Sequence, residues 1–110
     1  MPPDDTLVLV VTTVGSRADG LALSRSVVEA GLCACAQLET IESVYRWNGQ
    51  VQQEPEIRLI LKTTTTGADA LVERVMALHP YDVPALYTLR ADQAEAAFVQ
   101  WVRDNTPQAR

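Results

Sequence analysis

Side chains that could perform chemistry are few in this sequence, and its single histidine, His79, is the first candidate. Neutral imidazole suits copper, zinc and nickel, so His79 is the candidate metal ligand. His79 also continues an apolar helical stripe. The alternative is therefore a packed histidine with local hydrogen bonds near a helix end, where a protonated ring would complement the helix dipole. One histidine does not complete a metal site, and both interpretations stay open.

The two cysteines, Cys33 and Cys35, are separated by one residue in a segment that reads as extended. In a strand their Cα atoms would lie roughly 6.5 Å apart, near the upper limit for a disulfide, so we expect reduced thiols. Such a pair could bind a soft ion such as Cu(I). Free cysteine is among the most buried residue types, however, and we favour packing over metal binding.

Three aromatic residues and one lysine supply amphipathic surface: Tyr45, Trp47, Tyr81 and Lys62. If the segment that carries Tyr45 and Trp47 lies between subunits, these aromatics become interface anchors. Alternatively they line a small-molecule cleft in which Lys62 or Arg46 contacts an anion. The two interpretations are compatible, and we favour the interface.

Sequence motifs of nucleophilic and nucleotide-dependent enzymes are missing from the chain. It has no Gly-x-Ser-x-Gly sequence and no Walker-type glycine loop, and its carboxylates are spread along the chain. We therefore predict a binding protein that is not an enzyme and requires no cofactor.

The length and the acidic balance limit the organisation and the partners. The 110 residues fit one domain, and the formal net charge is −5, with the nine basic residues scattered. An acidic surface repels phosphate backbones, which argues against nucleic acid as a partner. No apolar stretch approaches the ~20 residues of a membrane span, and the N-terminus does not read as a signal peptide. We expect a cytoplasmic protein with no membrane partner.

The elements that must position these residues begin with a buried strand. Residues 7–11 are aliphatic and mostly β-branched, which is typical of a strand in the middle of a sheet. Ser16, with Asp19 three residues later, then starts a helix that Gly31 ends. The face of that helix expected to be buried carries Gly20, Leu23, Ser24, Val27, Val28 and Gly31.

A long hairpin follows this helix. Asn48-Gly49 between two alternating runs is a strong hairpin signal, because both turn residues must accept a positive φ. The arms, residues 33–47 and 51–66, each span about a dozen residues, where a usual strand has about five or six, so the hairpin would project beyond the domain. Pro55 marks an edge or a bulge. A half-apolar ribbon with unpaired edges predicts contact with another copy of the chain.

The second half repeats the order of the first. Thr66, with Asp69 three residues later, is expected to start a helix that Pro80 ends. Residues 85–89 read as a short strand, and Asp92 is expected to cap a last helix. The apolar side of that helix would carry Ala94, Ala97, Phe98, Trp101 and Val102. The order predicts an α+β, ferredoxin-like βαββαβ sandwich with an added C-terminal helix, in which the first and third strands are central.

Three segments, taken together, carry a resemblance to a known family. They are Ala34-Cys35-Ala36-Gln37 followed by Ser43-Val44-Tyr45-Arg46-Trp47-Asn48-Gly49, then residues 54–64 ending in Leu61-Lys62-Thr63-Thr64, then His79-Pro80-Tyr81-Asp82-Val83-Pro84. In their joint order and spacing they resemble the CutA family, the divalent-ion tolerance proteins. The similarity covers a core of residues 7 to about 104 and includes a tryptophan, Trp101, in the final helix.

The resemblance implies a tight cytoplasmic homotrimer in which long hairpins pair across subunits. The interface residues it implies are Tyr45, Trp47 and Trp101. It also implies an association with tolerance of copper or other divalent cations, without an established enzymatic activity. The family trimer is similar to that of the PII signalling proteins, which implies a ligand cleft between subunits. The cleft residues it implies are Cys35, Lys62 and Tyr81.

The sequence differs from the family at positions credited with copper binding in bacterial members. Those members have a cysteine in the first strand and two adjacent histidines before Pro-Tyr, where this chain has Thr12 and Leu78-His79. Ala85 also stands where the family usually has glutamate. We expect a CutA-like homotrimeric binding protein, with weak binding of Cu2+ or another divalent cation at His79 as its only metal function.

Two alternatives differ in kind from this expectation. One is a PII-like sensor that binds a small anion or metabolite between subunits near Lys62 and Tyr81. The other is an enzyme of acylphosphatase type, since that fold also carries an anion loop between its first strand and helix, here Gly15-Ser16-Arg17. Such an enzyme would need a nearby asparagine to position water, and Asn48 and Asn105 are expected in the hairpin turn and the tail.

Overall fold

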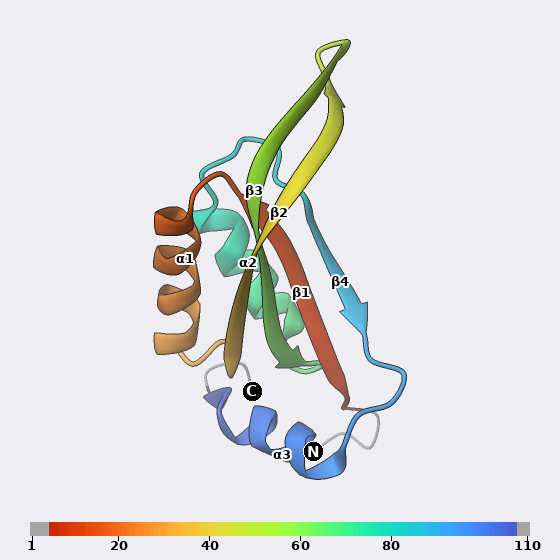
Figure 1. The fold of residues 1–110 in the computed structure, drawn as a ribbon. Helices are drawn as coiled ribbons and strands as arrows, with labels where there is room; N and C mark the ends of the chain where they lie inside the picture. The colour runs from red at the N-terminus through yellow and green to blue at the C-terminus, as the bar shows by residue number, and fades with distance from the viewer. Residues whose placement is uncertain (1–4, 108–110) are drawn as a thin grey trace.

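The computed structural model describes residues 5–107 as a four-stranded antiparallel sheet and three helices (Figure 1). The elements in chain order are β1 (Leu7–Val14), α1 (Arg17–Glu29), β2 (Cys35–Trp47), β3 (Gln50–Thr64), α2 (Ala68–Leu78), β4 (Leu86–Arg90) and α3 (Ala96–Asp104). The strand order is β2-β3-β1-β4, so the first and third strands are central. This is the predicted ferredoxin-like sandwich with an added C-terminal helix. Within residues 5–107, no helix is long and apolar enough to cross a membrane.

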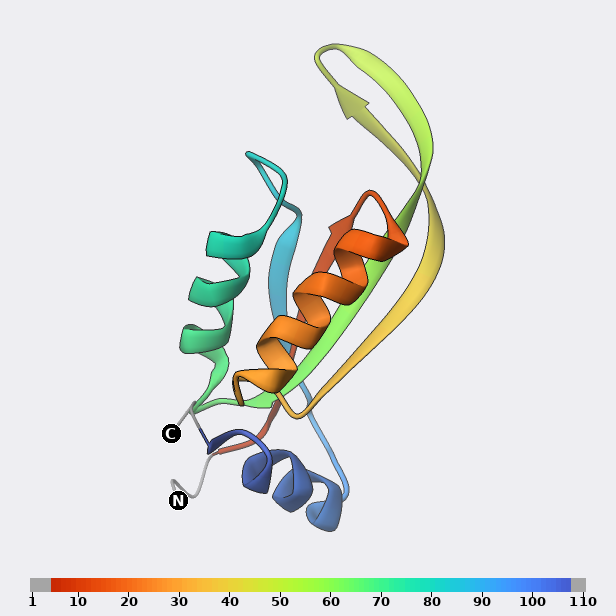
Figure 2. The same ribbon diagram turned by 90° about the vertical axis from the view of Figure 1, so that its left-hand side faces the viewer.

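Helices α1 and α2 cover one face of the sheet (Figure 2). Alternate residues of the central strands form the core beneath them, because successive strand side chains point to opposite faces. Val10 and Leu61 are register partners and wholly buried, as is Leu71 of α2. The other members of this core are Val14, Leu23, Val27, Leu32, Cys33, Ile57, Leu59 and Val75.

Helix α1 begins and ends where the sequence predicts. The Ser16 hydroxyl accepts a hydrogen bond at 3.1 Å from the amide three residues later. Just after the helix, Gly31 has φ 73°, and the Leu32 amide donates to the Val27 carbonyl at 3.0 Å, which closes a Schellman motif. Two residues of the face expected to be buried differ, and Gly31 is only partly buried. Val28 is 37% exposed, because the buried face of α1 is narrower than the predicted stripe.

The predicted starts of α2 and α3 are wrong. Helix α2 has Gly67 at its N-cap and no side-chain cap, and the Thr66 amide donates instead to the Asp5 carboxylate at 3.0 Å. Helix α3 is capped by the Glu95 carboxylate, which accepts from two backbone amides of the first turn at 2.9 and 3.1 Å. Asp92 lies in the turn before that helix. At α2, the tertiary hydrogen bond from the Thr66 amide to Asp5 overrides the local capping motif. At α3, the Glu95 carboxylate is better placed to cap the helix than that of Asp92.

The hairpin of β2 and β3 projects beyond the rest of the domain (Figures 1 and 2). Asn48 and Gly49 form its turn with φ values of 51° and 74°, as predicted. Strand β1 pairs with β3 only along residues 57–64, so residues 50–56 pair with β2 alone. Pro55 lies in that two-stranded part, where β3 has a free edge, which suits a residue that cannot donate a hydrogen bond.

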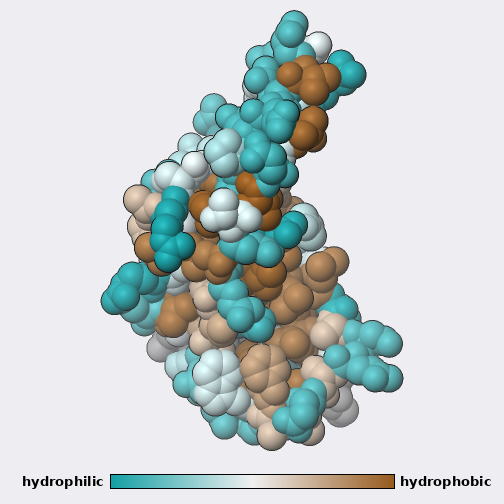
Figure 3. All heavy atoms as spheres, viewed as in Figure 1, coloured by the Kyte–Doolittle hydropathy of each residue, from teal (hydrophilic) through white to brown (hydrophobic). Residues whose placement is uncertain are grey.

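The second face of the sheet, here called the open face, is not covered by α1 or α2. Its apolar residues are Leu9, Val11, Ile60, Tyr87 and Leu89, which are neighbours by strand register. Helix α3 lies against β3 at one end of this face, where the Lys62 ammonium is 5.4 Å from the centre of the Phe98 ring. Hydrophobic residues gather over the strands on this side of the molecule, below the more hydrophilic hairpin (Figure 3).

Candidate functional site

His79 follows α2 and does not continue the apolar stripe of that helix, contrary to the prediction. The helix ends at Leu78, and His79 is its C-cap, with φ −68° and ψ 134°. This extended conformation is favoured before a proline, here Pro80, because the proline ring crowds the preceding residue in the α region. The extended backbone places the imidazole within hydrogen-bond distance of β1.

Both ring nitrogens of His79 are hydrogen-bonded. Nε2 lies 3.0 Å from the Thr13 carbonyl and 3.0 Å from the Thr12 hydroxyl, and the Tyr81 amide donates to Nδ1 at 3.1 Å. Because Nδ1 accepts a hydrogen bond, the ring is neutral with its proton on Nε2. The Thr12 hydroxyl donates to the Ala85 carbonyl at 2.7 Å and so accepts from His79. Partial burial lowers the pKa of His79, and the bond to Thr13 opposes part of that shift.

These contacts suit a structural histidine, and the surrounding residues do not fit a resident copper ion. A metal at either nitrogen of His79 would displace a hydrogen bond to β1 or to the Tyr81 amide. The hydroxyl and carbonyl oxygens that β1 offers are poor ligands for copper. Among residues 5–107, no group of three or more His, Cys, Asp or Glu side chains is placed to hold a metal ion. Metal binding at His79 stays a prediction.

Tyr81 lies between the β1–α1 turn and the base of the hairpin. A Cβ at Gly15 would lie 3.0 Å from the Tyr81 hydroxyl, so glycine makes room for it. Burial raises the pKa of Tyr81, and the carboxylates of Glu56 and then Glu54 raise it further. The Tyr45 hydroxyl donates to Glu54. Tyr81, a predicted cleft residue, and Tyr45, a predicted interface residue, thus belong to one acidic aromatic cluster.

Cys35 and Lys62 lie together near the end of β3, whereas Tyr81 lies beside the middle of that strand. Cys35 and Lys62 are register partners on β2 and β3, and the Lys62 ammonium lies over the Phe98 ring. From Glu56, beside Tyr81, to Lys62 the strand rises about 20 Å. A single chain therefore does not bring the three predicted cleft residues together, and a cleft that contains all of them needs more than one subunit.

The two cysteines are free thiols in different surroundings. Cys33 is fully buried in the core, and burial raises its pKa to about 12. Cys35 is only partly buried and borders a groove between α1 and β2. Packing accounts for Cys33, as predicted, whereas Cys35 is accessible in the single chain.

The tryptophans predicted to lie at an interface are exposed in the single chain. Trp47, beside the hairpin turn, is 53% exposed, and Trp101 on α3 is 45% exposed and stacked on Phe98 with ring centres 6.0 Å apart. Val44 and Val51 add more apolar surface to the hairpin. Large apolar side chains exposed in this way mark a contact surface.

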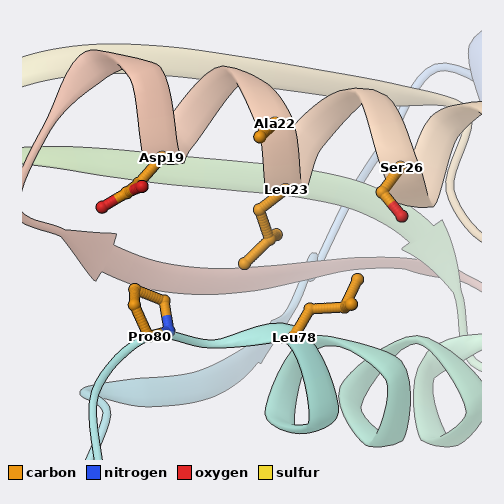
Figure 4. Close-up of a pocket in the computed structure, with 6 residues that line it drawn as sticks. All are labelled: Asp19, Ala22, Leu23, Ser26, Leu78 and Pro80. Carbon is orange, nitrogen blue, oxygen red and sulfur yellow. The ribbon is translucent and has the colours of Figure 1, made fainter.

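A narrow groove of about 180 Å³ separates α1 from the end of α2 (Figure 4). Leu23 extends from α1 toward Leu78 and Pro80, with Asp19 and Ser26 at its rim. Ligand pockets usually enclose about 300 Å³ or more, so this groove is too small to be the main binding site.

The loop of Gly15, Ser16 and Arg17 lacks the surroundings of an acylphosphatase site. The Ser16 hydroxyl is used as the cap of α1. Asn48 lies in the hairpin turn, and the Asn105 side chain donates to the Trp101 carbonyl at the end of α3 at 2.8 Å. Neither asparagine is beside the loop to position a water molecule.

Sequence reasoning missed the partners that hold the candidate residues. The contacts of Thr13 with His79, and of Phe98 with Lys62, join elements far apart in the chain, and no local pattern indicates them. The hairpin did carry a signal. Its two-residue turn fixes the register of both arms, and that register places Cys35 opposite Lys62.

Comparison with known proteins matches residues 8–105 to the CutA1 divalent ion tolerance protein family. The chain belongs to the CutA1 family. The divalent-cation tolerance protein CutA of Thermus thermophilus is 37% identical over 99 residues, which are 89% of this chain and 96% of that protein. The crystal structure of CutA1 from Ehrlichia chaffeensis is 35% identical, with a TM-score of 0.88, covering 94% of this chain and 97% of that one.

The name of another solved CutA structure bears on function. The PII-like protein CutA from Nostoc sp. PCC 7120 is 29% identical, with a TM-score of 0.85, and the match covers 90% of this chain and 96% of that one. The CutA1 match includes every helix and nearly every strand residue of this chain, from β1 to α3. The family that the sequence motifs indicate is therefore confirmed.

Proposed function

We propose that this CutA-family chain is a cytoplasmic homotrimer that binds its ligand between subunits and contributes to tolerance of divalent cations. The open face of the sheet carries the proposal. Five apolar residues gather on it beside Lys62 and the Arg58–Glu39 ion pair, and α1 and α2 leave it uncovered. Tyr87 and Leu89 on it are 49% and 50% exposed. Apolar surface of this kind marks a contact between proteins. The names of CutA relatives support the link with divalent cations.

The free edges of the sheet support a closed ring of copies. Strands β2 and β4 form the two edges, and they differ in length and sequence. Contacts between two different surfaces are heterologous, and they close into a ring when the rotation allows. The projecting hairpin, with Val44 and Trp47 exposed, extends far enough to lie on a neighbour. A trimer is the ring that the resemblance to CutA implies.

A matched pair of substitutions at two equally exposed side chains tests whether the open face is the interface. Leu89 on the open face is 50% exposed, and Met76 on α2 is 49% exposed. We expect Leu89→Lys to dissociate the assembly, because a buried unpaired ammonium is costly, and Met76→Lys to leave it intact. Native mass spectrometry distinguishes the two. An assembly that survives Leu89→Lys, or that only Met76→Lys disrupts, would contradict the proposed interface.

Cation binding at His79 is the finer part of the proposal. Both ring nitrogens already have partners, so we expect binding to be weak and to compete with the bonds to Thr13 and Tyr81. Calorimetric titration of the assembled protein with Cu2+, beside His79→Ala, tests it. Saturable heat that the substitution removes supports a metal role for His79. Equal heat in both proteins would leave His79 with a structural role only.

PII-like sensing of a small anion is a second candidate, favoured by the position of Lys62. Among residues 5–107 its ammonium forms no ion pair and lies over the Phe98 ring, so its charge is available. Lys62 and Tyr81 are separated by about 20 Å along one chain, so one small anion can touch both only between subunits. A saturable rise in Tm with inorganic phosphate that Lys62→Gln abolishes would support this function. A Tm that phosphate leaves unchanged would count against it.

A further inference from the structure

An ion pair interrupts the apolar residues of the open face. Arg58 on β3 and Glu39 on β2 are register partners, and the Arg58 Nε donates to the Glu39 carboxylate at 2.6 Å. Both side chains lie on the open face, because alternate strand residues share a face and Ile60 is the next such residue along β3. The ion pair thus separates Ile60 from Ile41, an apolar residue on the same side of β2 at the base of the hairpin.

A second copy that covers both the open face and the base of the hairpin encloses this ion pair. In the single chain the Arg58 and Glu39 side chains are 39% and 47% exposed, so water still reaches both charges. Enclosure removes that water, and an enclosed ion pair is tolerated only when its remaining hydrogen-bonding groups have partners. This step rests on the assembly proposed above.

The guanidinium of Arg58 has donors left to satisfy. A guanidinium carries N–H groups on all three nitrogens, and within the described chain only Nε has an acceptor. Because Glu39 already neutralises the charge of Arg58, the remaining donors suit neutral acceptors better than a second carboxylate. Backbone carbonyls at a free strand edge are such acceptors, and β2 and β4 are the edge strands of the sheet.

We propose that the Glu39–Arg58 ion pair is enclosed between copies of the chain, where Arg58 donates its free guanidinium N–H groups to backbone carbonyls at a strand edge of the second copy. Arg58 then determines the relative position of the copies, because the apolar contacts around it have no preferred direction. Hydrogen bonds are directional, and a displaced second copy would leave the enclosed donors without partners.

A second ion pair in the chain provides a matched control. Arg25 and Glu29 on α1 lie 2.8 Å apart with side chains 76% and 64% exposed, and α1 covers the opposite face of the sheet (Figure 2). Subunit exchange between isotope-labelled and unlabelled assemblies, followed by native mass spectrometry, measures how fast the copies separate. Arg58→Lys keeps the charge beside Glu39 but removes the other guanidinium donors. We expect it to speed exchange roughly tenfold or more, and Arg25→Lys to change exchange less than about twofold.

Removal of one partner and then of both tests the enclosure. Arg58→Met leaves Glu39 charged and unpaired, so it should speed exchange more than Arg58→Lys does. Adding Glu39→Met removes that charge, and the double variant should exchange more slowly than Arg58→Met alone.

Two results would overturn the enclosed ion pair while the assembly stands. One is an exchange rate that Arg58→Lys leaves unchanged, and the other is a double variant that exchanges no more slowly than Arg58→Met. A monomeric unmodified protein would instead overturn the proposed assembly and this inference with it.

Discussion

The imidazole of His79 ties the segment between α2 and β4 to the central strand β1. A bond to Thr13 and another from the Tyr81 amide hold the ring in its neutral form, and Thr12 relays the contact to Ala85. The sequence offers a packed, locally bonded histidine as one of two interpretations, because a lone histidine lacks co-ligands. It could not name these partners, since they depend on how α2 packs against the sheet.

The pH dependence of stability follows from the lowered pKa of His79. The unfolded chain takes up a proton near the ordinary pKa of 6.5, before the folded chain does, so folding is favoured above that pH and weakens as the pH falls. His79 is the only histidine. Urea unfolding at fixed protein concentration should show less stability at about pH 5.5 than at about pH 7.5, and His79→Gln should flatten the difference. An unchanged slope in the variant would contradict the assignment of a neutral ring.

A comparison of two buried threonines measures how much the hydrogen bonds of Thr12 contribute to stability. Thr12 and Thr63 are both fully buried, but the Thr12 hydroxyl bonds His79 and Ala85, whereas that of Thr63 has no partner in the described chain. Thr12→Val should cost about 1–3 kcal/mol of the free energy of unfolding, because it strands the Ala85 carbonyl. Thr63→Val should be neutral or stabilising. Chemical denaturation of both variants checks this, and equal costs would show that the hydroxyl bonds contribute little.

Elements with strong local signals are predictable, and those set by tertiary contacts are not. Asn48-Gly49 alone indicates the hairpin turn, and the aliphatic run from Leu7 indicates the central strand. The start of α2 is different. A local motif favours Thr66, yet its amide bonds Asp5, which lies far away in the chain. Helix starts of this kind can be predicted only when it is known which segments of the chain pack together.

Substitutions at the start of α3 distinguish the predicted cap, Asp92, from the observed cap, Glu95. Glu95 accepts from two backbone amides, so Glu95→Ala should lower the free energy of unfolding by ~1 kcal/mol. Asp92→Ala removes the residue that the sequence favours as the cap and should change stability by much less. Thermal unfolding monitored by circular dichroism measures both. A larger loss for Asp92→Ala would contradict the observed cap.

The whole molecule has features that one chain does not complete. Its sheet has an uncovered face with exposed apolar residues, and its hairpin projects beyond the domain. Lys62 lies near the end of β3, whereas Tyr81 lies beside Glu54 and Glu56 in the middle of that strand. The hairpin's length and its half-apolar arms are visible in the sequence, which is why contact with another copy could be predicted. The separation of the cleft residues is not visible there, because residues matched to one family site can belong to different subunits.

Sedimentation equilibrium of the unmodified protein at micromolar concentration is the most direct test of the trimer. The proposal predicts a single species of three times the 12.1 kDa chain mass, unchanged on dilution. A monomer of 12.1 kDa would leave the open face and the hairpin uncovered and would contradict both the proposed assembly and a ligand site between subunits.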